Sequence, residues 1–234
     1  MTLPASLADR LNRVRDEIAL AADAVGRDAS DLTLIVVTKF HPAALVTSLY
    51  DLGVRNVGEN RHQEAETKAR ECAELPDLRW HFIGQLQSNK ARAVRTYADV
   101  LHSVDRASLV DALAGGDPST RKHVRLDCFV QMNLTTDGGR GGATDESDVL
   151  DLADRIAGEP SLNLMGIMAV APLEEAPDVA FARVHQASVR LRQSHPEAAF
   201  ISMGMSHDFR EAIRHGATHL RIGTAITGSR PLPG

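Results

Sequence analysis

The sequence predicts the α/β class and, within it, a single-domain (β/α)8 TIM barrel with one extra N-terminal helix. The first observation is that short apolar segments alternate strictly with segments of helical periodicity, which favours a parallel sheet. Eight such apolar segments fit within 234 residues, a length near the lower end of the barrel range. The second observation is that residues able to do chemistry follow several different strands, whose carboxyl ends a barrel gathers in one ring.

The elements follow one another from the N-terminus. Apolar residues recur at three- and four-residue steps from Leu7 to Val25, which predicts an amphipathic helix with Gly26 as its stop. The first strand, 32–38, is a nearly continuous apolar run, which is typical of a parallel strand covered on both faces. Further strands are predicted at 54–58, 79–84, 99–104, 125–134, 162–170, 198–203 and 219–223, and further helices at 42–52, 60–74, 88–96, 106–114, 145–157, 176–193 and 206–215.

A doubly wound open sheet is the alternative architecture. It predicts Gly-x-Gly-x-x-Gly after the first strand, whereas this strand runs into Thr38-Lys39-Phe40-His41-Pro42 without a glycine. The barrel is therefore favoured. We expect residues 1–230 to form one domain and 231–234 a C-terminal tail, and we expect the glycine-rich segment 137–142 to be a flexible loop rather than a phosphate cradle.

Composition argues against several classes of protein. The formal charge is −5, from 26 basic and 31 acidic residues, which argues against nonspecific nucleic-acid binding. The N-terminal segment is charged throughout and no apolar run reaches membrane-spanning length, so neither a signal peptide nor a membrane segment is expected. Cys72 and Cys128 cannot form a disulfide framework, and no His/Cys cluster has zinc spacing. We expect a cytoplasmic protein without a metal site.

Two cations occupy strands that are otherwise apolar. Lys39 directly follows the first strand, and Arg221 interrupts the last strand, where a buried guanidinium needs a partner. Lys39 is either a solvated strand-end residue or an amine of lowered pKa that can form a Schiff base. In a closed barrel the last strand pairs with the first, so the two cations become neighbours and suit an anionic ligand. Gly223 and Thr224 follow the last strand, where barrels often bind phosphate.

Ser206 is the candidate at the preceding strand end. It is predicted to cap the helix over 206–215, with Asp208 in the first turn. Capping alone would explain Ser206, and the functional interpretation adds an anion bound at the N-terminus of that helix.

Six motifs between residues 34 and 230 occur in an order known from one family. In sequence order they are Leu34-Ile35-Val36-Val37-Thr38-Lys39, Val57-Gly58-Glu59-Asn60, Trp80-His81-Phe82-Ile83-Gly84, Leu164-Met165-Gly166-Ile167-Met168, Ser202-Met203-Gly204-Met205-Ser206-His207-Asp208 and Leu220-Arg221-Ile222-Gly223-Thr224. By these motifs the chain resembles the pyridoxal phosphate homeostasis proteins.

The resemblance implies a barrel like the N-terminal domain of alanine racemase, with pyridoxal phosphate held on Lys39 as an internal aldimine. It further implies that Arg221 faces the pyridine nitrogen and that Asn60 lies beside the ring. The implied phosphate-binding residues are Ser206, Gly223 and Thr224, and the implied pocket-lining residues are Met168 and His81.

Two departures from the family pattern bear on access to the cofactor. Phe40 and His41 follow Lys39 where many members carry Thr and Lys. The segment after Asn133 is glycine-rich where many members carry a Lys-Gly pair.

Two functions are compatible with this set of residues. A non-catalytic carrier would hold pyridoxal phosphate and deliver it to apo-enzymes, whereas an amino-acid racemase needs an acid/base on each face of its substrate. The resembling racemases take the second one, a tyrosine, from a second domain, for which the eight βα units leave no residues. Tyr50 and Tyr97 are both predicted away from the barrel mouth, and nothing recommends His81 or Cys128 as a substitute. We therefore expect a monomeric carrier without catalytic residues; the third possibility, a binding module without cofactor, requires Lys39 and Arg221 to be purely structural.

Overall fold

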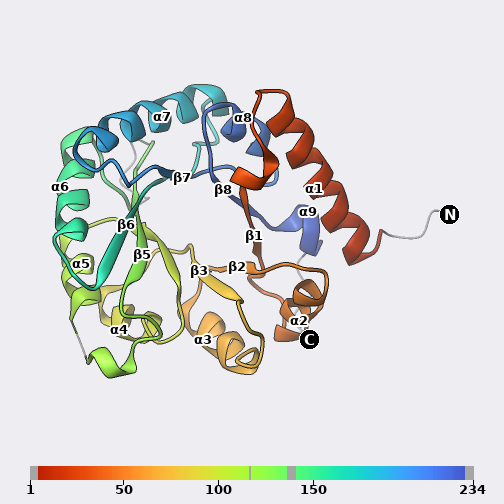
Figure 1. Ribbon diagram of the computed structural model, residues 1–234, viewed down its shortest axis with the longest axis horizontal. Helices are drawn as coiled ribbons and strands as arrows, with labels where there is room; N and C mark the ends of the chain where they lie inside the picture. The colour runs from red at the N-terminus through yellow and green to blue at the C-terminus, as the bar shows by residue number, and fades with distance from the viewer. Residues whose placement is uncertain (1–4, 116, 136–140, 230–234) are drawn as a thin grey trace.

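Eight parallel strands close into a barrel in chain order, as Figure 1 shows from one end of the barrel. The computed structural model describes residues 5–115, 117–135 and 141–229. The predicted C-terminal tail and part of the predicted 137–142 loop lie outside these residues. The strands are β1 (Thr33–Val37), β2 (Asn56–Glu59), β3 (Arg79–Phe82), β4 (Val100–Val104), β5 (Leu126–Gln131), β6 (Leu162–Met168), β7 (Phe200–Ser202) and β8 (His219–Ile222).

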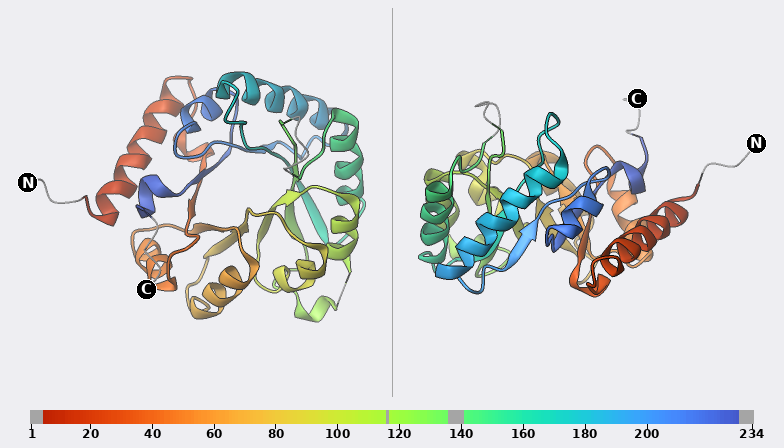
Figure 2. Two further views of the ribbon diagram at one scale, coloured as in Figure 1. Left: turned by 180° about the vertical axis from the view of Figure 1, so that it is seen from behind. Right: turned by 90° about the horizontal axis from the view of Figure 1, so that it is seen from above.

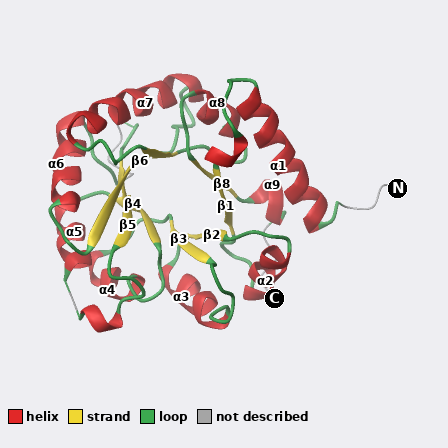
Figure 3. Ribbon diagram, viewed as in Figure 1, coloured by secondary structure: helices red, strands yellow, loops and turns green. Residues whose placement is uncertain are grey.

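Helices form the outer ring around the strands (Figure 3). They are α1 (Leu7–Asp23), α2 (Ala43–Asp51), α3 (His62–Glu71), α4 (Ala91–Val94), α5 (Ala107–Ala114), α6 (Glu146–Ala157), α7 (Pro177–Ser194), α8 (Phe209–Arg214) and α9 (Thr224–Thr227), with 3-10 turns η1 (Ala29–Asp31), η2 (Ser88–Lys90) and η3 (Pro118–Thr120). The predicted TIM barrel and its extra N-terminal helix are confirmed.

Two predicted helices are shorter than expected. The 88–96 helix is the turn η2 followed by the single turn α4. The 206–215 helix begins only at Phe209, because Asp208 N and Phe209 N both donate to Met205 O and close a tight turn before it.

The extra helix α1 fills the place of an eighth barrel helix. The helix after β8, α9, has only four residues, so it leaves the outer side of β8 and β1 uncovered. Helix α1 lies across this gap beside α8 and α9 (Figures 1 and 2) and buries Leu11, Val14 and Ile18. Arg10 Nε donates to Ile226 O over 2.6 Å, which ties α1 to α9.

The N-terminus of α1 is closed by a capping box. Ser6 Oγ accepts from Asp9 N, and the Asp9 carboxylate accepts from Ser6 N. Ser6→Ala is expected to lower the free energy of unfolding by about 1 kcal/mol, because helix amides lose their acceptor. Urea denaturation measures the change, with Thr67→Ala, exposed in α3, as a control that should not destabilise. An unchanged urea midpoint for Ser6→Ala would contradict this role of the capping box.

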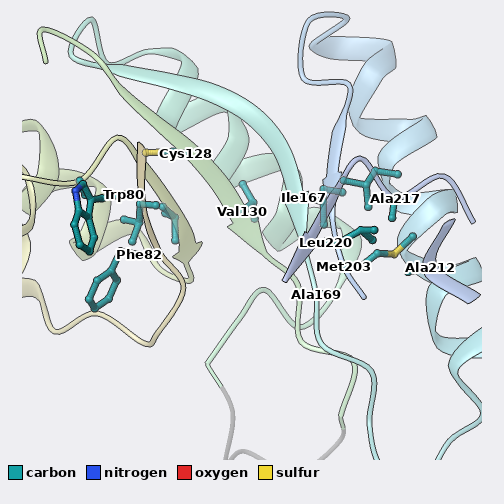
Figure 4. Packing of buried hydrophobic residues seen from close by; sticks show 14 of the residues in the cluster. Trp80, Phe82, Cys128, Val130, Ile167, Ala169, Met203, Ala212, Ala217 and Leu220 are labelled. Atoms are coloured by element: carbon teal, nitrogen blue, oxygen red, sulfur yellow. The ribbon is translucent and has the colours of Figure 1, made fainter. Parts of the chain in front are cut away.

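Apolar side chains pack in two layers. The larger cluster fills the space between strands and helices, where Met203 and Leu220 lie close to Ala212 of α8 (Figure 4). A small cluster of Val100, Phe129 and Met168 packs separately. Within the described ranges, none of the helices is long and apolar enough to cross a membrane.

Candidate functional site

The strand that precedes Lys39 pairs with the strand that contains Arg221. Ile35 of β1 pairs with Arg221 of β8, so both side chains face the same way. The interior is the side they share, because His219 of β8 meets His102 of β4 across the barrel, with ring centroids 6.2 Å apart. Lys39 is exposed in the turn that follows β1, two residues after its last residue, and its Nζ lies 5.7 Å from the centroid of the Phe40 ring. The predicted pairing of the last strand with the first is confirmed.

Asn60 directly follows the carboxyl end of the neighbouring strand β2. Gly58 of β2 pairs with interior-facing His81 of β3, and Asn60 is two residues further along. Asn60 Oδ1 is buried and has no hydrogen-bond partner within the described part of the chain. A buried amide without a protein partner is the arrangement expected of a side chain that bonds a ligand.

Arg221 is a buried cation held by neutral acceptors. Its exposed fraction is 4%, and its guanidinium donates to Ser202 Oγ at 2.6 Å and to Ala169 O at 2.9 Å. Burial lowers the pKa of Arg221 to about 10, an effect that the charge of Asp208 partly opposes. The group remains protonated at neutral pH and can act only as a donor.

A chain of hydrogen bonds continues from Arg221 across the barrel interior. His102 Nδ1 lies 2.8 Å from Ser202 Oγ, His102 Nε2 lies 2.9 Å from His81 Nδ1, and His81 Nε2 lies 2.9 Å from Asn56 Oδ1. Because the Asn56 oxygen can only accept, Arg221 can only donate, and burial lowers the pKa of both imidazoles well below neutrality, one arrangement of protons satisfies all four contacts. Each group donates toward Asn56, and both imidazoles are neutral and protonated on Nε2.

The interior histidines are neutral for physical reasons. Burial, and then the neighbouring His219 and Arg79, hold the pKa of His81 well below its ordinary value. Burial and His81 do the same for the pKa of His102. Burial, followed by Arg79 and Arg221, lowers the pKa of His219 to about 4. The acceptor lone pairs of the chain therefore face Arg221 and stabilise its charge.

The predicted phosphate-binding residues lie in two neighbouring segments. Arg221 N donates to Gly204 O, which brings the segment after β7 beside β8. A Cβ added at Gly223 would lie 3.5 Å from Val37 Cβ, so the segment after β8 adjoins β1. The first intrahelical bond of α9 runs from Ile226 N to Gly223 O, so the amides of Thr224 and Ala225 precede it. These amides are available to an anion.

The role expected of Ser206 as a helix cap is wrong. Asp208 is the residue before α8, and its Oδ1 accepts from Met205 N at 2.5 Å. Ser206 lies in the turn over 205–208, half-buried, one segment away from the Gly223 and Thr224 amides. Its hydroxyl is thus not used for capping.

The two residues implied to line the pocket lie deeper than expected. His81 is only 1% exposed and belongs to the hydrogen-bond chain inside the barrel. Met168 is 3% exposed and packs with Val100 and Phe129.

The alternative acid/bases are also poorly placed. Tyr50 Oη donates to Pro76 O, and Tyr97 stacks on His62 of α3 within the outer core. Burial raises the pKa of the Cys128 thiol, which packs in the outer core as well. Among the described residues, no group of three or more His, Cys, Asp or Glu side chains could hold a metal ion.

Sequence reasoning assigned no specific role to several residues that the structure connects to one another: His102, Ser202, His219, Glu59 and Lys68. His102 and His219 lie within predicted strands, so their burial could be predicted. Their partners could not, because these belong to strands far apart in the sequence. The contact between Lys68 and Glu59 crosses from α3 to β2. An (i, i+4) spacing between Glu64 and Lys68 was the one visible signal.

Together these groups form a site of hydrogen-bond donors. A primary amine follows β1, an amide side chain follows β2, a guanidinium lies within β8 and two backbone amides follow β8. Such a set suits a ligand that carries an anion, an acceptor atom and a group reactive toward an amine.

Comparisons with known proteins agree with this geometry. The profile of the alanine racemase N-terminal domain matches residues 10–231. The pyridoxal phosphate homeostasis protein of Mycobacterium leprae is 39% identical over 240 residues, covering 95% of this chain and 92% of the relative. That of Escherichia coli K12 is 36% identical over 229 residues, covering 96% and 97%.

Solved structures extend the comparison. PipY of Synechococcus elongatus, solved with pyridoxal phosphate bound, is 34% identical with a TM-score of 0.80, covering 95% of this chain and 100% of PipY. Alanine racemase of Streptomyces coelicolor is 18% identical with a TM-score of 0.72, covering 95% of this chain and 58% of the racemase, and shares the fold. On this evidence, the chain belongs to the pyridoxal phosphate homeostasis protein family.

Proposed function

We propose that this protein binds pyridoxal 5'-phosphate at the carboxyl-terminal mouth of its barrel, through Lys39, and serves to buffer or deliver it rather than to catalyse a reaction. The observation that carries the proposal is the pairing of β1 with β8. This pairing supports the proposal, because Ile35, four residues before Lys39, lies opposite Arg221.

The donor set fits the parts of this cofactor. Pyridoxal phosphate supplies an aldehyde that condenses with a primary amine, a pyridine nitrogen that accepts a hydrogen bond, and a phosphate. Lys39 would supply the amine, and Arg221 would donate to the ring nitrogen. Asn60, whose buried Oδ1 has no partner within the described residues, would lie beside the ring. The proposed phosphate-binding residues are Ser206, Gly223 and Thr224.

The placement proposed for Arg221 would handicap carbanion chemistry, although racemases of this barrel type manage it. A guanidinium donates its proton to the ring nitrogen without giving it up, so the ring stays unprotonated and withdraws electrons weakly. A two-base racemase further needs an acid/base opposite Lys39. Tyr50 and Tyr97 are engaged elsewhere, and the relatives are named for homeostasis of the cofactor.

The remaining features of the proposal concern the whole protein. We infer a cytoplasmic monomer in which residues 1–230 form one domain, and apo-enzymes that require pyridoxal phosphate as its recipients. Cys72 and Cys128 are both free cysteines, which supports a reducing compartment.

Lys39→Ala tests the proposal. Protein is incubated with pyridoxal phosphate, freed of excess, reduced with borohydride and analysed by peptide mass. We expect the label on Lys39 in the wild type and none in Lys39→Ala, while Lys90→Ala is labelled like the wild type. An unlabelled wild type, or a label that persists in Lys39→Ala, would overturn the assignment.

A second measurement separates carrier from racemase. L-alanine is incubated with loaded protein in deuterated water and followed by NMR. A carrier leaves the α-proton in place on the timescale of enzyme turnover. Appearance of D-alanine at the median enzyme rate, on the order of 10 per second, in wild type but not in Lys39→Ala would establish the racemase instead.

A further inference from the structure

A buried charged network lies directly behind Lys39. Lys68 of α3 is 5% exposed and Glu59 at the end of β2 is fully buried. Lys68 Nζ donates to Glu59 Oε1 and to Glu64 Oε1, each at 2.7 Å. A buried ion pair is weak evidence for stability, because desolvation offsets the attraction. Its position beside Lys39 therefore requires another explanation.

The network bonds the residue before Lys39. The third hydrogen bond of the Lys68 ammonium goes to Thr38 O at 2.8 Å. Thr38 Oγ1 in turn donates to Glu59 Oε1 at 2.6 Å. Backbone and side chain of Thr38 are thus both fixed to groups from β2 and α3.

The network also bonds the residue after Lys39. Phe40 N donates to Glu64 Oε1 at 2.5 Å. Phe40 has a φ of +68°, in the left-handed region that a bulky side chain rarely adopts. Such a conformation persists only where the surroundings determine it, and the Glu64 carboxylate supplies one such constraint.

We propose that Glu59, Glu64 and Lys68 are positioning residues that fix the backbone on both sides of Lys39 and so hold its amine in the orientation needed to react with the cofactor aldehyde. This inference rests on the proposed function. The reaction it serves joins the Lys39 nitrogen to the aldehyde carbon and releases water, so no further reactant is needed.

Glu64 offers the sharpest test, because it is the most exposed member of the network, at 22%, and its replacement is the least disruptive. Glu64→Ala removes the acceptor for Phe40 N, whereas Glu64→Gln keeps an acceptor oxygen. Glu66→Ala, on the same helix with 48% side-chain exposure, makes the same change of charge without touching residues 38–40. The double variant Glu59→Gln/Lys68→Met tests the buried Glu59–Lys68 ion pair. It removes both charges of this pair, so neither is left buried without its partner.

Two ligands separate positioning from a general structural role. Pyridoxal phosphate reports reaction with Lys39, measured as the rate of label fixed by borohydride. 4'-Deoxypyridoxine phosphate has no aldehyde and reports only the remaining contacts, measured by titration calorimetry.

We expect Glu64→Ala to slow labelling of Lys39 roughly 10- to 100-fold, as for reacting groups displaced by about 1 Å, while its affinity for 4'-deoxypyridoxine phosphate stays within about twofold of the wild type. Glu64→Gln should recover most of the rate, and Glu66→Ala should match the wild type. The Glu59→Gln/Lys68→Met double variant should slow labelling in the same way.

Other outcomes overturn the inference. If Glu64→Ala labels as fast as the wild type, the network is structural only. The same conclusion follows if the labelling rate with pyridoxal phosphate and the affinity for 4'-deoxypyridoxine phosphate fall by the same factor. Failure of the wild type itself to label Lys39 would instead refute the proposed function, so the two failures are distinguishable.

Discussion

Lowering the pH from 7 to 5 is expected to reduce the free energy of unfolding by several kcal/mol. The cause is the set of three histidines inside the barrel, His81, His102 and His219, which are buried and neutral. The unfolded chain exposes these rings to water, where each takes up a proton near its ordinary pKa of 6.5. Acid therefore stabilises the unfolded state relative to the folded one.

The sign and the pH range follow from proton uptake. Because the folded-state pKa is depressed, the stabilisation is complete above pH 6.5 and is lost as the pH falls toward the folded-state pKa, about 4 for His219. Each fully shifted histidine contributes up to about 1.4 kcal/mol per pH unit in that range, so roughly 2 kcal/mol each is lost by pH 5. The aspartates whose pKa is lowered start from 3.8, so they act below this range.

Urea denaturation at intervals between pH 7 and 5 measures the loss. His219→Phe should reduce the slope of the free energy of unfolding against pH by about one third, because a phenyl ring cannot titrate. The ring should also pack well against Phe129 and Phe200, whose rings already lie edge-on to His219. Gln186→Ala, exposed on α7, removes no titratable group and should leave the slope unchanged. A slope in His219→Phe equal to that of the wild type would show that His219 does not contribute.

The architecture could be predicted because its signals are local. Strand runs such as 32–38 and the periodicity from Leu7 to Val25 depend only on neighbouring residues, and the structure contains both elements. The start of α8 could not be predicted, since it depends on a turn in which Met205 O accepts two amides. Ser and Asp residues are typical both of a helix N-cap at Ser206 and of this turn, so the sequence alone does not distinguish the two structures.

Candidate residues at strand ends were predictable, whereas their supports were not. Lys39 and Arg221 stand out because charges interrupt apolar runs. The hydrogen-bond chain through Ser202 and His102 joins β7 to β4, and such contacts depend on strand register and closure of the whole barrel. Glu59 was quoted within a motif, yet its buried bonds to Thr38 and Lys68 leave no periodic trace in the sequence.

Gly84→Ala is expected to destabilise the protein by about 3 kcal/mol, at the upper end of overpacking effects, and to weaken binding of pyridoxal phosphate. A Cβ on Gly84 would lie 2.2 Å from Asn60 O and 2.8 Å from Asn60 C and Cα. These are backbone atoms, which cannot turn aside like the end of a side chain. Gly84 itself is held by Ser103, whose Oγ donates to Gly84 O at 2.6 Å. The strain therefore falls on Asn60, at the mouth of the barrel.

The loss of affinity should act through Asn60 and can be measured in a double-mutant cycle. Titration with 4'-deoxypyridoxine phosphate should show Gly84→Ala binding roughly tenfold more weakly, if about 1.4 kcal/mol of strain is relieved by displacing Asn60. In an Asn60→Ala background the same substitution should no longer change affinity, although it should still lower the urea midpoint. Gly115→Ala, whose Cβ would meet Asp111 O at an ordinary 3.4 Å, is the control for both readouts. If Gly84→Ala weakens binding equally with and without the Asn60 side chain, the close approach of Gly84 to Asn60 serves the fold alone, and Asn60 does not contact the ligand.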